Sequence, residues 1–248
     1  MEVWAIRAGN TLTAAADRAL YQGELEATGW HGHAAPVLLV GLSGRFGLHW
    51  AGRSEQCRSA LVDAGVAHVF DPRGERVALV YLEPDAPEAR GLRPLLAREG
   101  GVLPDPLRVP LARSAAETRL GSFDLRALFA FRWAEAAPVD ARVARSVQLL
   151  RAPALAPASR EAAAALAHLS ASRFNHLFRA EMGVSFRSYR VWSQLRAAML
   201  HAGPGTRLTD AAQEGAFTDS AHFSRVFRQT FGMTPSAVLK PLASVRLL

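Results

Sequence analysis

Two different hydrophobic patterns divide the chain into halves. Up to about residue 84, short runs of apolar and β-branched residues are separated by breaks that contain Gly or Pro. Runs spaced by roughly 8–12 residues are typical of antiparallel strands in a sandwich or small barrel. The predicted strands are 20–27, 37–42, 46–50, 59–62, 67–70 and 77–82.

From Pro87 onward the pattern becomes helical. Apolar residues recur at intervals of three and four, which predicts helices at 89–98 and 122–136 and nearly continuous helix beyond Pro138. We therefore expect an α+β protein of two domains, with a strand-rich domain over residues 1–137 and an all-α domain over residues 138–248.

The all-α half contains an internal repeat. The segment SRFNHLFRAEMG (172–183) aligns with AHFSRVFRQTFG (221–232) at an offset of 49 residues, and the Phe, Arg and Gly positions are kept. Each copy predicts a helix with an inward apolar stripe and a glycine that ends it. A short Ala-rich helix precedes each copy, at 159–167 and at 209–214. A short helix, a tight turn and a second helix form a helix-turn-helix unit, and this plan occurs twice.

Helical geometry, at about 100° per residue, places polar side chains opposite the apolar stripe. The outward residues are Ser172, Asn175, His176 and Arg179 in the first copy and Ala221, Ser224, Arg225 and Arg228 in the second. Arg pairs with guanine, Asn pairs with adenine, and small side chains leave room for a thymine methyl. An ordinary solvated helix face is the alternative. Two copies in the same register favour insertion into DNA major grooves.

The net charge of +7 is concentrated in the all-α half. Residues 1–138 carry 15 Arg and 16 Asp or Glu, whereas residues 139–248 carry 14 Lys or Arg and 6 Asp or Glu. A segment with this excess of positive charge favours a polyanionic partner. Charge alone leaves DNA, RNA and a membrane surface as alternatives.

The spacing of the two copies fits one face of a DNA duplex. The predicted helix 186–201 lies between them and spans about 24 Å at 1.5 Å per residue. With the flanking turns, the two reading helices are expected about 34 Å apart, which is one turn of B-DNA.

Two stretches of the all-α half carry specific motifs. They are AFTDSAHFSRVFRQTFGMTPSAVLK (216–240) and LSASRFNHLFRAEMGVSFRSYRVWSQLRAA (169–198). Both resemble the DNA-binding domain of the AraC/XylS transcriptional regulators. The resemblance implies base contacts by Ser172, Asn175, His176, Ala221, Ser224 and Arg225. It also implies phosphate contacts by Arg179 and Arg228, and we assign the same role to Arg173.

Three turn positions depart from the pattern of that family. Ala216 stands where the family usually has Gly, and His168 replaces a small turn residue. Gly215 replaces a larger apolar residue of the second short helix. Since Gly in a helix costs roughly 0.5–1 kcal/mol relative to Ala, we expect this helix to be weakly formed.

The resemblance implies a cupin-like β-barrel in the first half, which binds a small-molecule effector, dimerises, or both. His31-Gly32-His33 is similar to the His-x-His of a cupin strand, and His68 falls near a later cupin histidine. Neutral imidazoles on adjacent strands can hold a divalent metal. However, the acidic ligand expected after His-x-His is missing. Pocket or surface histidines without metal are therefore the main expectation, with no cofactor, and a metal site at His31, His33 and His68 is the alternative.

Other residues offer weaker candidates. Cys57 is the only cysteine, which excludes an internal disulfide, and it reads as a buried apolar side chain rather than a reactive thiol. Five aromatics are expected in the barrel core, with the lining of an apolar pocket as the alternative: Trp4, Trp30, Phe46, Trp50 and Phe70. A further group is a candidate homodimer face: Phe123, Phe129, Phe131 and Trp133.

The sequence therefore predicts a sequence-specific DNA-binding transcription regulator that is not an enzyme. The expected partners are double-stranded DNA, an effector, a possible second subunit and, for an activator, RNA polymerase. A metal-dependent cupin enzyme with a DNA-binding appendage and a non-specific nucleoid protein are the alternatives. The chain shows no signal peptide and no apolar run long enough to cross a membrane, so a cytoplasmic location is expected.

Overall fold

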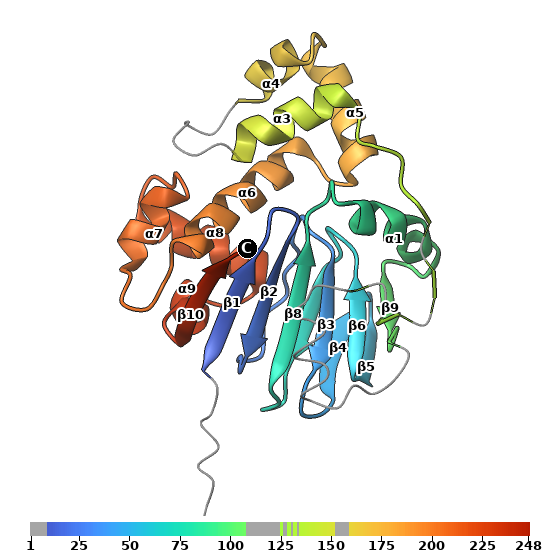
Figure 1. Cartoon of the computed structure of the whole chain (residues 1–248). Helices are drawn as coiled ribbons and strands as arrows, with labels where there is room; N and C mark the ends of the chain where they lie inside the picture. The colour runs from blue at the N-terminus through green and yellow to red at the C-terminus, as the bar shows by residue number, and fades with distance from the viewer. Residues whose placement is uncertain (1–8, 108–124, 126–127, 130, 133, 152–158) are drawn as a thin grey trace, which may run out of the picture.

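Strands occupy most of the first hundred residues and helices most of the last hundred (Figure 1). The computed structural model describes residues 9–107, 125, 128–129, 131–132, 134–151 and 159–248. Its strands are β1 (Asn10–Ala14), β2 (Arg18–Gly23), β3 (Val37–Gly41), β4 (Phe46–Trp50), β5 (Arg53–Cys57), β6 (Ser59–Val62), β7 (His68–Asp71), β8 (Val77–Leu82), β9 (Val102–Pro104) and β10 (Leu242–Leu247). Its helices are α1 (Pro87–Arg98), α3 (Ala141–Arg151), α4 (Arg160–Leu166), α5 (Ala171–Met182), α6 (Phe186–Leu200), α7 (Leu208–Glu214), α8 (Ser220–Phe231) and α9 (Pro235–Leu239).

The described strands form two sheets. A seven-stranded sheet has the order β10-β1-β2-β8-β3-β6-β9, and a three-stranded sheet has the order β5-β4-β7. All pairs are antiparallel except β1 with β10. The sheet-rich first half is therefore confirmed. The expected closed barrel is not found among the described strands, because β4, β5 and β7 pair only with one another.

Strand β3 lies at the centre of the large sheet and is buried on both faces. Its run of five consecutive buried residues explains why the sequence there is continuously apolar instead of alternating. Val37 and Leu39 face one core, which continues into the smaller sheet and the C-terminal helices. Leu38 and Val40 face a second core, which α1 covers.

The predicted helix 122–136 is wrong for the residues that the structure describes there. Leu128 lies in a turn, and Phe129 forms an isolated bridge with Leu107. Both side chains are buried in the second core, so an irregular segment buries the apolar residues that suggested a helical stripe. The rest of this prediction, including Trp133, lies outside the described residues.

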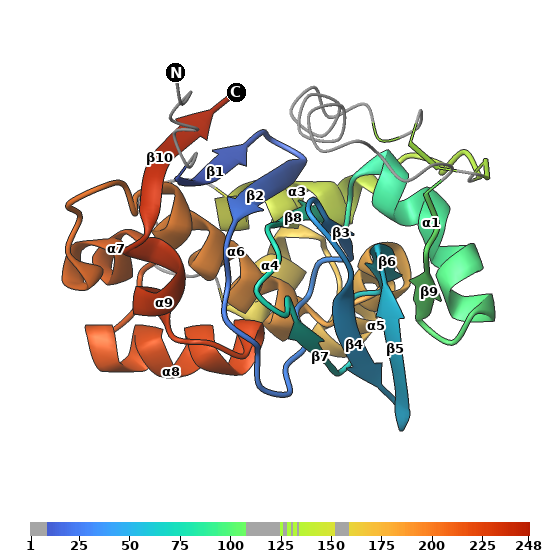
Figure 2. The same cartoon turned by 90° about the horizontal axis from the view of Figure 1, so that it is seen from below.

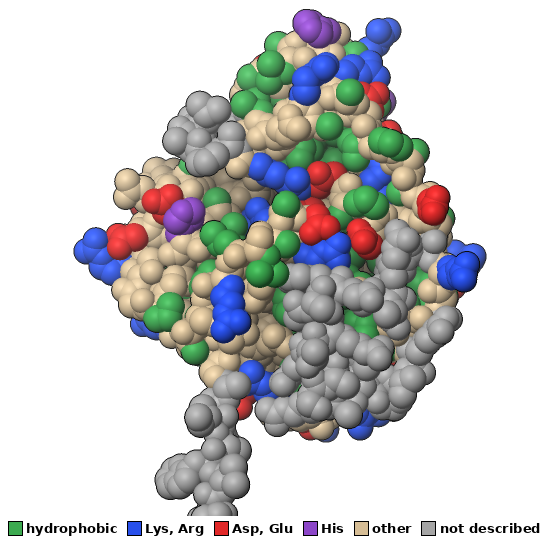
Figure 3. Space-filling model, viewed as in Figure 1, with side chains coloured by type: hydrophobic (Ala, Val, Ile, Leu, Met, Phe, Trp, Pro, Cys, Tyr) green, Lys and Arg blue, Asp and Glu red, His purple; other side chains and the backbone are tan. Residues whose placement is uncertain are grey.

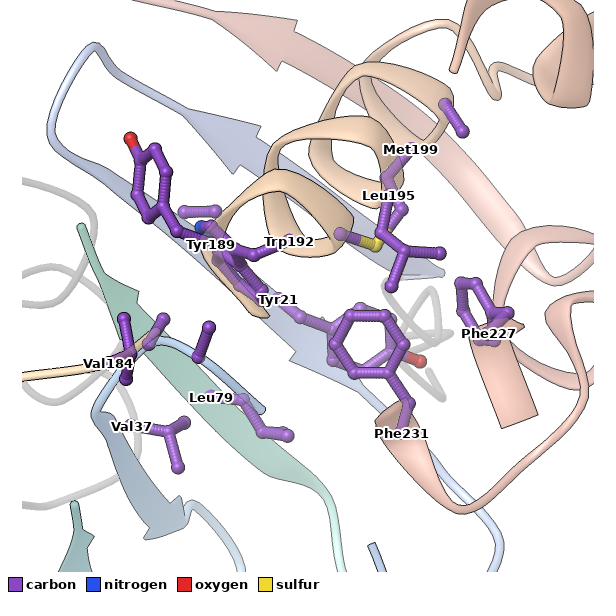
Figure 4. Close-up of a cluster of buried hydrophobic side chains, with 14 of the residues drawn as sticks. Tyr21, Val37, Leu79, Val184, Tyr189, Trp192, Leu195, Met199, Phe227 and Phe231 are labelled. Carbon is purple, nitrogen blue, oxygen red and sulfur yellow. The ribbon is translucent and has the colours of Figure 1, made fainter. Parts of the chain in front are cut away.

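The C-terminal helices cover one face and one end of the large sheet (Figures 1 and 2). Helix α6 runs between the two repeated units and packs its Trp192, Leu195 and Met199 against the strands (Figure 4). Strand β10 then adds to the sheet at the edge of β1, which the sequence analysis did not predict. None of the described helices is both long and apolar enough to cross a membrane.

Candidate nucleic-acid interface and interdomain cavity

The two repeated helices, α5 and α8, begin and end in the same way. The Ser170 hydroxyl accepts a hydrogen bond from the backbone N–H of Arg173, and the Asp219 carboxylate accepts one from the N–H of His222. Such N-caps satisfy backbone donors that the first turn leaves unpaired. Each helix ends at a left-handed glycine, with φ of 75° at Gly183 and 72° at Gly232. The glycine caps expected from the repeat are confirmed.

An aromatic stripe fixes the inner face of each of these helices. Phe174, Phe178 and Met182 of α5 are buried, as are Phe223, Phe227 and Phe231 of α8. The α5 rings pack against Phe186 and Tyr189 of α6, with ring centroids 5.3–5.8 Å apart. Since α6 also carries Trp192 toward Phe231, one helix supports both units. The inner stripes therefore determine which faces of α5 and α8 remain outside.

The residues expected to contact DNA lie on the outer faces of α5 and α8. None of the nine is buried: Ser172, Arg173, His176, Arg179, Ala221, Arg225 and Arg228 are exposed, and Asn175 and Ser224 are partly exposed. In the described part of the chain, the four arginines of this set form no ion pair. Their guanidinium groups are therefore available to an external anion. Whether each residue meets a base or a phosphate stays a prediction.

A basic groove of about 500 Å³ lies beside α5. Asn175, His176 and Arg179 line one side of it, and Arg187 and Arg190 of α6 line the other. These two α6 arginines were not predicted, because the sequence indicated that helix only as a spacer. Their place beside α5 depends on contacts between helices that no local pattern indicates. Together the two arginines widen the positive surface available for phosphate contacts.

Residues of the N-terminal half contact the C-terminal ends of α5 and α8. Arg90 of α1 donates to the carbonyl and the carboxylate of Glu181, both at 2.9 Å. Arg93 donates to the carbonyls of Ala180 and Glu181. These cations meet the negative end of the α5 dipole. At α8, the carbonyl of Gly232 accepts a hydrogen bond of 2.8 Å from the N–H of Gly29.

A buried carboxylate joins the sheet to the helices. Glu83, next to the end of β8, is only 2% exposed. It forms ion pairs with Arg151 of α3 at 2.8 Å and Arg196 of α6 at 3.1 Å. The Trp192 indole and the Tyr189 hydroxyl also donate to it. Figure 3 shows acidic and basic side chains together along this boundary between the helices and the sheet.

A small apolar cavity lies between the sheet and the second unit. Its free volume is about 60 Å³, which is room for about two water molecules. Tyr21 and Leu79 line it from the sheet, and Phe227 and Phe231 close it from α8 (Figure 4). Tyr81 of the sheet also lines it. Burial raises the pKa of both tyrosines, so their hydroxyls stay protonated.

The three candidate metal ligands come together at this cavity. His31, His33 and His68 are all buried, and one ring nitrogen of each lies within 4.8 Å of those of the other two. Cys57, in contrast, is 1% exposed, and burial raises its pKa to about 12. A protonated buried thiol agrees with the interpretation of Cys57 as core.

Three further expectations need correction. Trp30 is 62% exposed, so it does not belong to the core, and Trp4 lies outside the described residues. Phe129 is 1% exposed and packs within its own chain, so it does not form part of a dimer face, while Phe123 and Trp133 lie outside the described residues. Helix α7 is formed, and Gly215 is its C-cap rather than an interior residue. A Cβ at this position would lie 2.7 Å from the carbonyl oxygen of Gln194, so close packing against α6 requires the glycine.

Residues 163–241 match the family described as "Helix-turn-helix domain". Sequence and structure therefore agree that these residues form a helix-turn-helix domain. Among curated proteins, the arabinose operon regulatory protein of Escherichia coli (strain K12) is 32% identical over 102 residues, which are 40% of this chain and 35% of the relative. The Salmonella typhimurium protein of the same name gives 32% identity over 102 residues, covering 40% and 36%. The chain thus spans about a third of the length of either relative. The predicted resemblance to AraC/XylS regulators is confirmed for this domain.

Among solved structures, ToxT from Vibrio cholerae O395 has a similar fold over nearly the whole chain. The TM-score is 0.59 at 12% identity, covering 92% of this chain and 98% of ToxT. A structure described as unsaturated fatty acid bound ToxT has a TM-score of 0.54 at 11% identity, covering 92% and 96%. At these identities the similarity concerns the fold, and it includes both halves of the chain.

Proposed function

We propose that this protein is a transcription regulator that binds double-stranded DNA through α5 and α8. The observation that carries the proposal is the pair of helices with equivalent caps, buried aromatic stripes and outward arginines that form no ion pair with any described residue. Two such helices joined by α6 suit two successive major grooves of one duplex. The matches to regulatory proteins favour this function over an enzyme.

Selection of bound sequences from a random DNA pool tests the proposal. The expected product is a site with two conserved blocks about one helical turn apart. Arg225→Ala is then expected to cost roughly 1–3 kcal/mol at one position of that site and to relax preference there. Arg98→Ala, which removes an exposed arginine of α1, is the matched control and should leave the selected sequence unchanged. A pool that shows no enrichment would reduce the protein to a non-specific binder.

The same proposal assigns a small apolar effector to the interdomain cavity. Support comes from the apolar lining and from the fatty acid in the similar ToxT structure. Because drug-sized ligands need about 300–1,000 Å³, the effector would displace α8 from the sheet. That displacement would change the relative orientation of α5 and α8. In this scheme a second subunit and, for an activator, RNA polymerase are further partners.

The proposed effector site is tested with a long-chain unsaturated fatty acid, because that ToxT structure is described as bound to an unsaturated fatty acid. Its binding is measured by calorimetry, and DNA affinity is measured with and without it. A change in the dissociation constant for DNA of about fivefold or more is expected, which is the ordinary range of allosteric coupling. Binding of the fatty acid without any change in DNA affinity contradicts control through this cavity.

A further inference from the structure

The fold brings three histidines to one face of a small sheet region. His31 and His68 face each other in an isolated antiparallel bridge, with hydrogen bonds of 3.1 and 2.9 Å between their backbones. His33 follows His31 by two residues, so its side chain points to the same side. The ring centroids lie 4.2 Å apart for His31 and His68, 5.4 Å for His33 and His68, and 5.8 Å for His31 and His33.

The surrounding backbone fixes the tautomer of all three rings. The Nδ1 atom of His31 lies 3.0 Å from the carbonyl oxygen of Gly29. In His33 the corresponding distance to the Ala35 oxygen is 2.5 Å, and in His68 the distance to the Val66 oxygen is 2.9 Å. Because a carbonyl oxygen only accepts hydrogen bonds, each Nδ1 carries the proton and donates. Each neutral ring therefore keeps a lone pair on Nε2.

One of these lone pairs is left without a partner inside the protein. In the described part of the chain, the Nε2 atom of His33 is buried and makes no hydrogen bond. An unsatisfied buried polar atom is costly, so it indicates a missing ligand.

We propose that His31, His33 and His68 bind one divalent transition-metal ion through their Nε2 atoms. Imidazole nitrogens suit Zn²⁺, Cu²⁺, Ni²⁺ and Fe²⁺ rather than Mg²⁺ or Ca²⁺. The carbonyl groups that hold the three Nδ1–H groups are the usual supports of histidine ligands. Metal–nitrogen bonds of about 2.0–2.1 Å in a tetrahedral site bring the nitrogens to about 3.3 Å from one another. One ring nitrogen of each histidine already lies within 4.8 Å of those of the other two, so metal binding would require the ligand atoms to move closer together.

The proposed site lies beside the end of α8. A Cβ at Gly232 would lie 2.9 Å from Nδ1 of His31, and the Gly232 carbonyl bonds to the N–H of Gly29. The same histidines line the apolar cavity, so a remaining coordination position of the metal faces that space. A bound ion would therefore stiffen the segment between Thr28 and His33, against which α8 rests.

Metal binding is tested on the full chain without an affinity tag and without DNA. The protein is stripped with a chelator, titrated with Zn²⁺ against a chromophoric chelator, and its metal content is measured by elemental analysis. One Zn²⁺ per chain is expected for the native protein. His68→Gln, which has similar volume, should bind Zn²⁺ at least about a hundredfold more weakly, in line with loss of a ligand. His201→Gln, which removes an exposed histidine, is the control and should bind like the native protein.

A second measurement needs no variant, so it stands if His68→Gln does not fold. X-ray absorption of the zinc-loaded native protein should show three imidazole nitrogens at about 2.0 Å. Less than one tightly bound Zn²⁺ per chain, equal binding by His68→Gln and His201→Gln, or a shell without imidazole overturns the proposal. Because no DNA is present, these outcomes are independent of the proposed regulatory function.

Discussion

Two residues in the turns of this protein have a strained backbone conformation. His168 and Ala216 occupy equivalent turns of the two helix-turn-helix units, and both have left-handed backbones, with φ of 53° and 54°. A side chain with a Cβ is disfavoured there by about 1–2 kcal/mol. Both residues are exposed, and backbone hydrogen bonds hold the strained conformation: the N–H of Leu169 donates to the Ala164 carbonyl, and the N–H of Phe217 donates to the Ala212 carbonyl. At Ala216 the chain departs from the glycine that its resemblance implies, and at His168 it departs from a small turn residue.

Ala216→Gly is expected to stabilise the protein. The substitution removes the left-handed penalty but adds entropy to the unfolded chain, which leaves a net gain of about 0.5–1 kcal/mol. Denaturant unfolding followed by circular dichroism measures the change. Ala162→Gly in α4, an exposed helical alanine, is the control and should lose about 0.5–1 kcal/mol. A loss of stability in both variants would contradict the strain at Ala216.

Cys57 is expected to resist alkylation in the folded protein. With a pKa of about 12 and 1% exposure, only about one thiol in ten thousand is a thiolate at pH 8. Mass spectrometry after iodoacetamide treatment should show slow labelling in buffer and fast labelling in guanidinium chloride. Rapid labelling of the native protein would instead restore Cys57 as a reactive thiol.

At the scale of elements, local signals predicted the helices well and non-local pairing poorly. The caps, stripes and glycines of α5 and α8 lie within a dozen residues of one another, so periodicity alone located these helices. The edge strand β5 was missed because four of its five residues are exposed and polar. The predicted helix 122–136 failed because Leu125, Leu128 and Phe129 are buried by tertiary contacts without helical structure.

The candidate-site residues likewise fall into two groups: those that a local sequence pattern predicts and those that only the structure brings together. Outward positions on α5 and α8 follow from helical geometry, and the convergence of His31 with His33 follows from the two-residue period of a strand. The pairing of His31 with His68, and the role of Arg187 beside α5, depend on contacts between distant segments. Those contacts carry no local pattern, so only the structure reveals them.

Arg173, Arg179 and Arg228 are expected to contact phosphates, and Arg179 provides the test of this assignment. Arg179→Ala should weaken binding to every DNA sequence by a similar factor and reduce the slope of log affinity against log salt by about one. Fluorescence anisotropy at several salt concentrations, with selected and scrambled duplexes, measures both quantities. Arg98→Ala should leave the slope as it is. A loss confined to the selected duplex would place Arg179 at a base.

At the scale of the whole molecule, the two halves are joined through buried charge as well as apolar packing. Glu83 pairs with Arg151 and Arg196 from different helices; Arg151 also pairs with Asp85, whereas Arg196 forms no other ion pair among the described residues. Glu83→Gln is therefore expected to lower the free energy of unfolding by about 1–3 kcal/mol, mainly through the loss of the partner of Arg196. Glu99→Gln, at an exposed pair with Arg98, should change it by less than about 0.5 kcal/mol. Equal effects in a denaturant titration would show that Glu83 does not join the halves.

The C-terminal strand provides the second connection between the halves. Strand β10 continues directly from the helix-turn-helix domain and pairs in parallel with β1 of the large sheet. Its first residue, Leu242, is 3% exposed and lines the interdomain cavity. A chain that ends at Pro241 loses this strand and leaves one side of β1 unpaired, while β2 keeps its partner β8.

We therefore expect faster amide hydrogen exchange in β1 of the shortened chain, with β2 and β8 still protected. Removing only Leu247 and Leu248, which are 68% and 72% exposed, is the matched control. This control keeps the register from Asn10 to Thr13 and should retain protection there. If β1 exchanges equally slowly in both shortened chains, β10 does not hold the sheet edge in solution. Exchange that rises in β1 and also at the Gly29–Gly232 contact would show that the strand and α8 are released together, as expected if one interface fixes the orientation of the second reading helix.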